Sequence, residues 1–500
     1  MPFLLGYDIG SSSIKASLLD IDSGSALASA YSPETELPIR SPMPGYAEQD
    51  PMSWWEHVIL ASRKLAGQGF DLGDVKAIGI SYQMHGLVLV DEKGSVLRPA
   101  IIWCDSRAVE TGNEIARRIG SEKCFRCLGN LPGNFTSMRL LWVKDNEPEV
   151  FKRIHKAMLP GEFTGMMLTG KIVTTRAGLS EGMFFDFETG EFAGRIYDDL
   201  GMSSDLLPDV APTFGFQGEV TREASRAIGV QAGTPVTYRA GDQPNNALSL
   251  GVLNPGEVAA TAGTSGVIVA VTDRDPHDSL SRFNVFVHVN DQPEALRRVV
   301  LLCVNGAGSL YRWLRQNVHG SDGGSLSYEQ MNLRASEVSV GSDGLVFLPF
   351  GNGAERILSN RGHGASLHNV DFNVHTLGHI IRAAQEGIVF ALNYGAEIVR
   401  SSGVEIEVVR SGKTNMFQSD LFCEAFANTI GATVELYDAD GSQGAARGAG
   451  IGAGIYSFEN AFHGLEKVRE IRPDHAASAA HRAAYQRWLE VLSKEISDDR

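Results

Sequence analysis

Basic residues are scarce in this sequence relative to acidic ones. The chain has 44 Lys and Arg against 60 Asp and Glu, which gives a formal net charge of −16 at pH 7. A surface of this sign repels the phosphate backbone of nucleic acids and the anionic headgroups of membranes. We therefore expect neither nucleic acid nor a membrane as a partner.

Cysteine is scarce as well. The chain has five cysteines, an odd and scattered set that is typical of reduced thiols in a cytoplasmic protein. Cys124-Phe125-Arg126-Cys127 has the Cys-x-x-Cys spacing but no second ligand pair. Two ordinary thiols are therefore the preferred interpretation over a zinc or redox site.

Long hydrophobic runs are also lacking. The apolar start of the chain is interrupted at Asp8 without a preceding basic segment, and a typical apolar stretch is Val299–Val304. Such a stretch is far too short to span a bilayer, so we predict no membrane span, no targeting segment and a cytoplasmic location.

The sequence has the composition of an ordinary globular protein, with 43% hydrophobic and 21% charged residues over 500 positions. That length predicts two to four domains. Strand-like runs such as Val75–Ser81 alternate with helical patterns, which predicts α/β layers. A hairpin is predicted over Gly182–Ala193 and a loop over Gly351–Ser366. Helices are predicted over Met52–Ala66, Ala108–Ile119, Met138–Asp145, Asn245–Gly251, Gly308–Asn317, His375–Val399, Gln418–Ile430 and His481–Ile496.

Two turns rich in glycine and hydroxyl residues carry the first chemical signal. Gly10-Ser11-Ser12-Ser13 joins the apolar runs Phe3–Tyr7 and Ile14–Leu19, and Gly263-Thr264-Ser265-Gly266 lies between two similar runs. Each turn is predicted to be the tip of a hairpin. Successive N–H groups in such a turn form a concavity that binds phosphate oxygens. Because one turn opens each half of the chain, the pattern predicts a duplicated scaffold that grips a polyphosphate from two sides.

Two aspartates stand beside predicted strand ends. Asp8 precedes the first turn, where a bound phosphate would need a divalent cation, Mg²⁺, to sit beside a carboxylate. Asp242 follows a strand and Gly241, and phosphoryl transfer requires a carboxylate that accepts the proton of the acceptor hydroxyl. Capping of a turn is the alternative for both residues.

A polar cluster follows two successive strand ends. It comprises Gln83, Met84 and His85, and then Trp103 and Asp105. Amide, imidazole, indole and carboxylate groups together could hydrogen-bond and stack on a polyhydroxylated ring or chain, which favours a small polar ligand. A structural histidine and a core tryptophan are the alternatives.

These motifs, in their order along the chain, resemble the FGGY carbohydrate kinases. The resemblance rests on the segments already named and covers nearly the whole chain. Further along it is carried by Arg382-Ala383-Ala384-Gln385-Glu386-Gly387 and Gly444-Ala445-Ala446-Arg447-Gly448.

The resemblance implies an α/β actin-like ATPase fold of two ribonuclease-H-like domains with a catalytic cleft between them. Residues 1–240 would form the N-terminal domain, with the sugar site and the first phosphate turn. Residues 241–500 would form the C-terminal domain, with the catalytic base, the second phosphate turn and the adenosine site.

The resemblance also implies the roles of individual residues. Asp242 would be the catalytic base, with Asp8 and Asp242 beside the Mg²⁺ ion. The residues expected to bind the sugar are Gln83, Met84, His85, Trp103, Asp105 and Gln243. Those expected to bind ATP are Gly10, Ser11, Ser12, Ser13, Lys15, Gly263, Thr264, Ser265, Gly306, Gly412, Lys413 and Asn415.

Within the family, Gln-Met-His-Gly followed by Trp-x-Asp-x-Arg is most similar to the xylulokinase group, and implies phosphorylation of D-xylulose at its terminal hydroxyl by ATP. A kinase for another ketose or polyol, such as ribulose, remains an alternative. So does a catalytically silent actin-like nucleotide-binding protein, and a homodimer is left open.

The chain departs from the family pattern at several positions. Tyr82 stands where glycine is common, Cys104 where asparagine is usual, and Arg410 in a loop that is otherwise glycine-rich. Asn245 and Asn246 replace small residues.

Overall fold

The computed structural model describes residues 1–318, 324–359, 361 and 363–498, and they form two compact units. Unit 1 comprises Met1–Gly251, Phe286–Arg298 and Ala439–Leu465, and unit 2 comprises Val252–Val285, Val299–Asp438 and Glu466–Arg500. The units are therefore interleaved along the chain, because two later segments return to unit 1.

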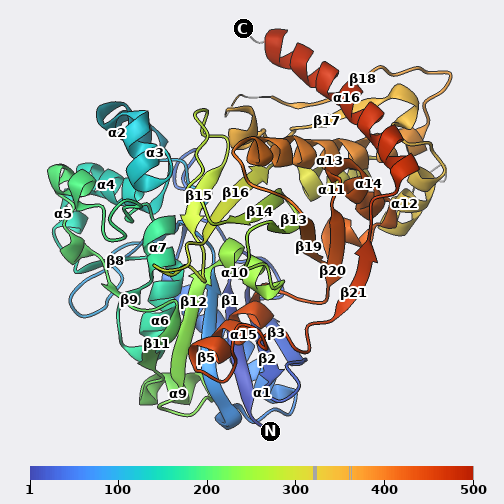
Figure 1. The fold of residues 1–500 in the computed structure, drawn as a ribbon. Coiled ribbons are helices and arrows are strands. Elements are labelled where there is room, and N and C mark those ends of the chain that lie inside the picture. Colours follow the sequence, from blue (N-terminus) through green and yellow to red (C-terminus); the bar gives the residue numbers. More distant parts are fainter. Residues whose placement is uncertain (319–323, 360, 362, 499–500) are drawn as a thin grey trace. The chain divides into compact units, whose positions relative to one another are not determined.

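Unit 1 is built on a six-stranded sheet in the order β11-β12-β5-β1-β2-β3 (Figure 1). Strands β1 (Phe3–Ile9), β5 (Val75–Tyr82) and β12 (Pro235–Gly241) are parallel neighbours. The other strands, β2 (Ile14–Asp20), β3 (Ala26–Ser32) and β11 (Phe214–Glu219), pair in antiparallel fashion. The carboxyl ends of β1, β5 and β12 consequently meet at one edge of the sheet, where α/β proteins place their ligands.

The hairpins predicted at the two glycine-rich turns are both confirmed. In unit 1, β1 pairs with β2 so that Asp8 lies opposite Lys15. In unit 2, β13 (Glu257–Ala262) pairs with β14 (Gly266–Thr272), and Ala262 lies opposite Gly266.

Alternate residues of β1 face two different cores. Phe3, Leu5, Tyr7 and Ile9 belong to the cluster that includes Trp54 and Val58 of α1 (Pro51–Gly67) and Phe163 of α6 (Pro160–Thr169). Leu4 faces the opposite side, in a smaller cluster with Ala446 and Ala449 of α15 (Gly441–Gly452). The period of two follows directly from strand geometry.

Helix α15 packs unusually close to the sheet because glycines leave space for it. A Cβ added at Gly6 of β1 would lie 1.9 Å from the carbonyl oxygen of Ser442, and one at Gly79 of β5 would lie 1.9 Å from that of Ala445. The backbone of the Gly/Ala-rich helix α15 thus packs directly against the backbones of β1 and β5.

Unit 2 contains a seven-stranded sheet, β15-β16-β14-β13-β19-β20-β21. Its remaining strands are β15 (Asn284–Val287), β16 (Arg298–Val304), β19 (Val408–Gly412), β20 (Thr433–Tyr437) and β21 (Lys467–Ile471). The long buried helix α13 (Leu377–Ser401) contacts β14, α11 (Ala307–Asn317), α12 (Tyr328–Ser336), α14 (Asp420–Ile430) and α16 (His475–Asp498).

Most predicted helices are confirmed to within a few residues, including α2 (Val109–Ile119) and α4 (Thr136–Asn146). The largest differences at a helix start are in α10 (Asp242–Ser249) and α16, which begin three and six residues earlier than expected. Among the described residues, no helix combines the length and hydrophobicity needed to cross a membrane.

Two segments differ from the prediction. Between residues 182 and 193 a single antiparallel bridge joins Phe185 to Phe192, so the segment is a bridged turn instead of a strand pair. The predicted loop Gly351–Ser366 contains the short 3-10 helix η5 (Glu355–Leu358) and the start of β18 (Ala365–His368), and its positions 360 and 362 lie outside the described residues.

Candidate functional site

The carboxyl edge of the unit 1 sheet brings the two predicted aspartates to neighbouring strand ends. Asp8 lies in β1 opposite Ser81 of β5, and the Ser81 hydroxyl donates a 2.8 Å hydrogen bond to Asp8 Oδ1. Asp242 follows the last residue of β12, the next strand along. The sheet order therefore places Asp8 and Asp242 on either side of β5.

Asp8 is also held against the start of α15. A Cβ added at Gly441, the first residue of that helix, would lie 2.6 Å from Asp8 Oδ2. Burial raises the pKa of Asp8, and the nearby charge of Asp440 raises it further, whereas Ser81 and Lys15 oppose the change. A cation beside Asp8 would relieve this cost.

Asp242 is the first residue of α10. Burial raises its pKa to about 7, the negative charge of Asp8 adds to the rise, and hydrogen bonds from Gln243 oppose it. The negative charge of Asp8 thus disfavours ionisation of Asp242. Paired carboxylates in this relation are the oxygen donors that Mg²⁺ prefers, so the residues present fit that ion.

Asn245 fixes α10 relative to α15. Its side-chain N–H donates a 2.8 Å hydrogen bond to the carbonyl of Gly441, the residue that abuts Asp8. A Cβ at Gly444 would lie 2.5 Å from Ser249 Cβ, so the two helices are in close contact. Asn245 therefore has a structural role: it ties the helix that carries Asp242 to the residue against which Asp8 rests.

The predicted sugar-binding segment begins where β5 ends. Gln83 is buried, and its Nε2 donates to Gln49 Oε1 at 3.4 Å, while its own Oε1 has no hydrogen-bond partner among the described residues. The same holds for Gln243 Oε1 beside Asp242. Buried amide oxygens without protein partners are suited to accept hydrogen bonds from ligand hydroxyl groups.

Met84 lies next to Gly241, and His85 follows it in the chain. A Cβ at Gly241 would lie 2.6 Å from Met84 Cγ, so the end of β12 and the Met84 side chain are packed together. His85 has a left-handed backbone (φ 62°), and its ring lies 4.9 Å from that of Phe135 and 5.5 Å from that of Phe286. Apolar rings thus surround an imidazole one residue from Met84.

Trp103 and Asp105 have different surroundings. The Trp103 side chain is 50% exposed, and its Nε1 donates to Ser11 Oγ of the first turn at 3.3 Å. Asp105 is fully buried, and its carboxylate accepts the Ala47 N–H at 2.6 Å and a bidentate pair from Arg107. The observed partners of this carboxylate are protein groups, which favours a positioning role for Asp105.

Glu181, at the end of α7 (Arg176–Glu181), was not identified from the sequence. It is buried, its Oε2 accepts the Tyr82 hydroxyl at 3.2 Å and its Oε1 accepts the His85 N–H at 3.2 Å. Burial raises the pKa of Glu181, and the negative charges of Glu162 and Asp242 raise it further. The available signal was an isolated glutamate in the otherwise small or apolar run Ala177–Phe185.

The departure at Tyr82 has a physical explanation. The Tyr82 ring lies over Gly161 of α6, where an added Cβ would be 2.1 Å from Tyr82 Cδ1. The Tyr82 hydroxyl donates a hydrogen bond to Glu181. A glycine at position 82 would leave the Glu181 carboxylate without this donor.

The first turn presents mostly accessible groups. It is closed by a 3.1 Å hydrogen bond from the Gly10 N–H to the Ser13 carbonyl, and Ser12 and Lys15 are exposed. Gln49 Nε2 holds the Ser11 carbonyl at 2.7 Å. The turn is therefore braced by its own backbone and by Gln49.

Unit 2 contains a cavity of about 330 Å³ beside the second turn. Gly263, Thr264 and Asn415 line it, and the N–H of Gly308, another lining residue, donates a 2.7 Å hydrogen bond to the Gly263 carbonyl. The full lining is Gly263, Thr264, Gly308, Ser309, Tyr311, Arg312, Tyr328, Glu329, Asn332, Asn415, Met416, Gln418 and Ser419.

The other residues predicted to bind the nucleotide do not line this cavity. Gly306 lines a second cavity of about 550 Å³, and Ser265 donates to Asn305 Oδ1 at 3.2 Å. Gly412 ends β19, and Lys413 is exposed just beyond it. Arg410, within the same strand, pairs with Glu257 and Glu435 on the two neighbouring strands, so its presence is accounted for by ion pairing.

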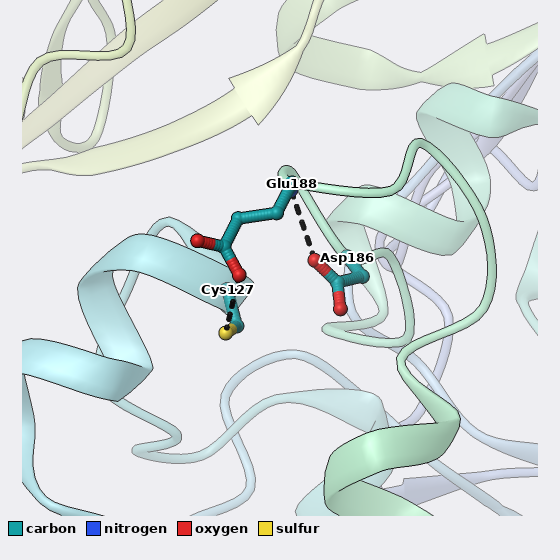
Figure 2. A group of neighbouring side chains, drawn as sticks. All are labelled: Cys127, Asp186 and Glu188. Atoms are coloured by element: carbon teal, nitrogen blue, oxygen red, sulfur yellow. Dashed lines mark hydrogen bonds between the residues drawn. The ribbon is translucent and has the colours of Figure 1, made fainter.

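One further group of side chains has metal-ligand character. Cys127, Asp186 and Glu188 place a thiol and two carboxylates within 4.8 Å of one another (Figure 2). Arg195 already pairs with Asp186 at 2.5 Å and with Glu188 at 2.7 Å, and burial raises the pKa of the Cys127 thiol. The guanidinium supplies the positive charge that a metal would bring, in agreement with the expectation that these cysteines are ordinary thiols.

Comparison with known proteins identifies the family. Residues 3–249 match the N-terminal domain of the FGGY family of carbohydrate kinases, and residues 258–456 match its C-terminal domain. The chain is 28% identical to the xylulose kinase of Escherichia coli (strain K12) over 98% of both chains. It is 27% identical to that of Bacillus subtilis (strain 168) over 91% of this chain and 89% of the relative.

The fold agrees with these matches. A crystal structure of a xylulose kinase from Rhodospirillum rubrum superimposes with a TM-score of 0.86, at 25% identity and with 98% of both chains covered. The chain thus has the fold of that kinase over nearly its whole length. The chain therefore belongs to the FGGY family of carbohydrate kinases, phosphotransferases that use ATP as the phosphoryl donor.

Proposed function

We propose that this kinase phosphorylates D-xylulose at its terminal hydroxyl, with Asp242 as the general base. The observation that carries the assignment is the carboxyl edge of the unit 1 sheet. There Asp242 follows β12, and the Gln83–His85 segment follows the adjacent strand β5. The names of the relatives support the choice of sugar.

The proposed step uses the Asp242 carboxylate as the proton acceptor. The hydroxyl oxygen attacks the γ-phosphorus, the bond from that phosphorus to the bridging oxygen of ADP breaks, and the hydroxyl proton passes to the Asp242 carboxylate. Without a cation, burial and the charge of Asp8 raise the pKa of Asp242 to about 7; Mg²⁺ beside it would lower that pKa and favour the ionised carboxylate that accepts the proton. Mg²⁺ held by Asp8 and Asp242 would neutralise charge on the phosphates.

The sugar is recognised by groups that are preorganised before it binds. The amide oxygens of Gln83 and Gln243 are buried acceptors for its hydroxyl groups, and Met84 and His85 provide an apolar and an imidazole surface. Such a site discriminates strongly against a substrate lacking one hydroxyl group, because a buried polar atom is then left unpaired.

For ATP, we assign the first turn, Gly10–Ser13 with Lys15, to phosphate binding in unit 1. In unit 2 we assign the cavity beside Gly263, Thr264 and Asn415 to the nucleoside. Gly306, Ser265, Gly412 and Lys413 lie outside the lining of this cavity and are weaker candidates on that ground.

A coupled assay of ADP release with a panel of pentuloses, hexuloses and polyols tests the substrate. We expect D-xylulose to give the highest kcat/KM. A higher value with D-ribulose or a polyol would replace the sugar while keeping the chemistry. ATP binding without turnover of any panel member would favour a silent nucleotide-binding protein.

The role of Asp242 is tested separately with Asp242→Asn, which keeps the size of the side chain and removes the base. We expect kcat to fall by about 10²–10⁴-fold while ATP still binds. Retention of more than a tenth of the wild-type kcat would exclude Asp242 as the base.

A further inference from the structure

Glu181 contacts His85 twice. Its side-chain Oε1 accepts the His85 backbone N–H at 3.2 Å, and its backbone carbonyl lies 2.9 Å from His85 Nδ1. A carbonyl oxygen can only accept, so Nδ1 carries the proton in this contact. In the neutral ring the lone pair is then on Nε2.

The same carboxylate joins the ends of two strands. Its Oε2 accepts the hydroxyl of Tyr82, the last residue of β5, at 3.2 Å. A Cβ added at Gly241, the last residue of β12, would lie 2.3 Å from that oxygen. Glu181 therefore fills the space between the strand end that leads to His85 and the strand end that leads to Asp242.

His85 requires such support. Its backbone has φ 62°, a left-handed conformation that is unfavourable for a residue with a side chain unless its surroundings impose it. The Glu181 carboxylate binds the N–H of this very residue, and the Arg139 guanidinium binds its carbonyl. Two buried side chains, a carboxyl group and a guanidinium, thus hold a single peptide segment in place.

We propose that Glu181 is the positioning residue of the sugar site, holding the left-handed backbone and the ring of His85 in register with Asp242. This inference rests on the proposed function, in which His85 contacts the sugar. Glu181 acts through His85 and Tyr82. A sugar hydroxyl that meets this imidazole would donate its hydrogen to Nε2.

Three variants separate positioning from general stability. Glu181→Ala removes both side-chain contacts. Glu181→Gln keeps the shape, since its oxygen can accept the His85 N–H and its amide can donate to the Tyr82 hydroxyl. Glu162→Gln is the matched control, because Glu162 is also buried and accepts a backbone N–H, that of Leu159, at 2.7 Å.

In steady-state kinetics with D-xylulose, we expect Glu181→Ala to raise the sugar KM about five- to hundredfold, the range for losing a buried hydrogen bond. The KM for ATP should change less than about twofold. Glu181→Gln should restore the sugar KM to within about threefold of wild type. Glu162→Gln should leave both KM values unchanged even if it lowers the melting temperature.

Equal changes in both KM values, or no change in the sugar KM, would overturn the proposal. If Glu181→Ala does not fold, Tyr82→Phe takes its place, because it removes only the hydroxyl that holds Glu181 Oε2. We then expect a two- to tenfold rise in the sugar KM alone, and an unchanged value would equally overturn the proposal. A wild-type enzyme inactive on every sugar would instead refute the proposed function.

Discussion

The Ser81 hydroxyl donates a 2.8 Å hydrogen bond to Asp8, across two strands that place these residues opposite each other. This bond favours the ionised carboxylate and so opposes the rise in the pKa of Asp8 that burial causes. Asp8 is thereby kept available as a ligand for a cation.

We expect Ser81→Ala to weaken binding of Mg²⁺. The free Mg²⁺ concentration for half-maximal activity should rise roughly ten- to hundredfold, as expected when a hydrogen bond to a charged group is lost. Ser17→Ala is the control: it removes another buried hydroxyl, bonded at 2.7 Å to Ser442, without contacting Asp8. A similar Mg²⁺ requirement for both variants would contradict the assignment of Asp8 to the metal.

The raised pKa of Asp242 predicts that catalysis and stability conflict at this position. Below about pH 4 the folded and unfolded chains both protonate Asp242, so it costs no stability. As pH rises toward the folded value of about 7, the unfolded chain ionises first and the free energy of unfolding falls. Above pH 7 the free energy of unfolding stays lower by the full cost of ionising the buried Asp242.

In metal-free buffer, Asp242→Asn should therefore stabilise the protein at pH 8, on the order of 2–4 kcal/mol, and have little effect near pH 4. Urea unfolding at the two pH values measures this. Asp91→Asn should have the opposite sign, because hydrogen bonds lower the pKa of Asp91. Equal stability of Asp242→Asn and wild type at pH 8 would show that Asp242 is ionised at little cost.

The close packing of α15 against the sheet predicts that one methyl group added at Gly6 strongly destabilises the protein. Gly6→Ala places a Cβ 1.9 Å from the carbonyl oxygen of Ser442, so strand and helix must separate. We expect a loss of at least about 3 kcal/mol in the free energy of unfolding, or failure to fold. Gly67→Ala, whose added Cβ would have no atom within 4 Å, should be neutral or slightly stabilising.

The two cavities of unit 2 lie along the same helix, α11, and only one is assigned to the nucleoside. Tyr328 lines the assigned cavity and stacks on Tyr311, with ring centroids 5.6 Å apart. Tyr328→Ala should raise the KM for ATP about three- to tenfold and leave the sugar KM unchanged.

Trp313 provides the comparison, because it lines the other cavity and is 54% exposed. Trp313→Ala should leave the KM for ATP unchanged. If Trp313→Ala raised the KM for ATP and Tyr328→Ala did not, the nucleoside would be assigned to the second cavity. Gly306, which lines that cavity, would then be a nucleotide-binding residue.

The sequence was sufficient to predict the features that depend on short segments. Both Gly-rich hairpins and most helices follow from local periodicity and turn residues, and Asp8 and Asp242 were identified because each adjoins a strand end. The interleaving of the two units could not be deduced in this way. It depends on the packing of Gly441–Gly452 against β1, between residues more than 400 positions apart.

Side-chain partners were also beyond local analysis. The distance between Asp105 and Arg107 in sequence is only two residues, yet whether that carboxylate would face a ligand or an arginine depends on the turn geometry. Glu181 was missed because its partners, Tyr82 and His85, lie almost a hundred residues earlier.

The glycine-mediated fit of α15 has a consequence for synthesis on the ribosome. The strands of unit 1 are complete once β12 has been made, but the helix that covers one face of this sheet begins about 200 residues later, at Gly441. At translation rates of roughly 5–20 residues per second, that face stays uncovered for roughly 10–40 seconds. Leu4 and Ala77 are then open to solvent or to chaperones, and a chain that stops short of Gly441 never closes this core.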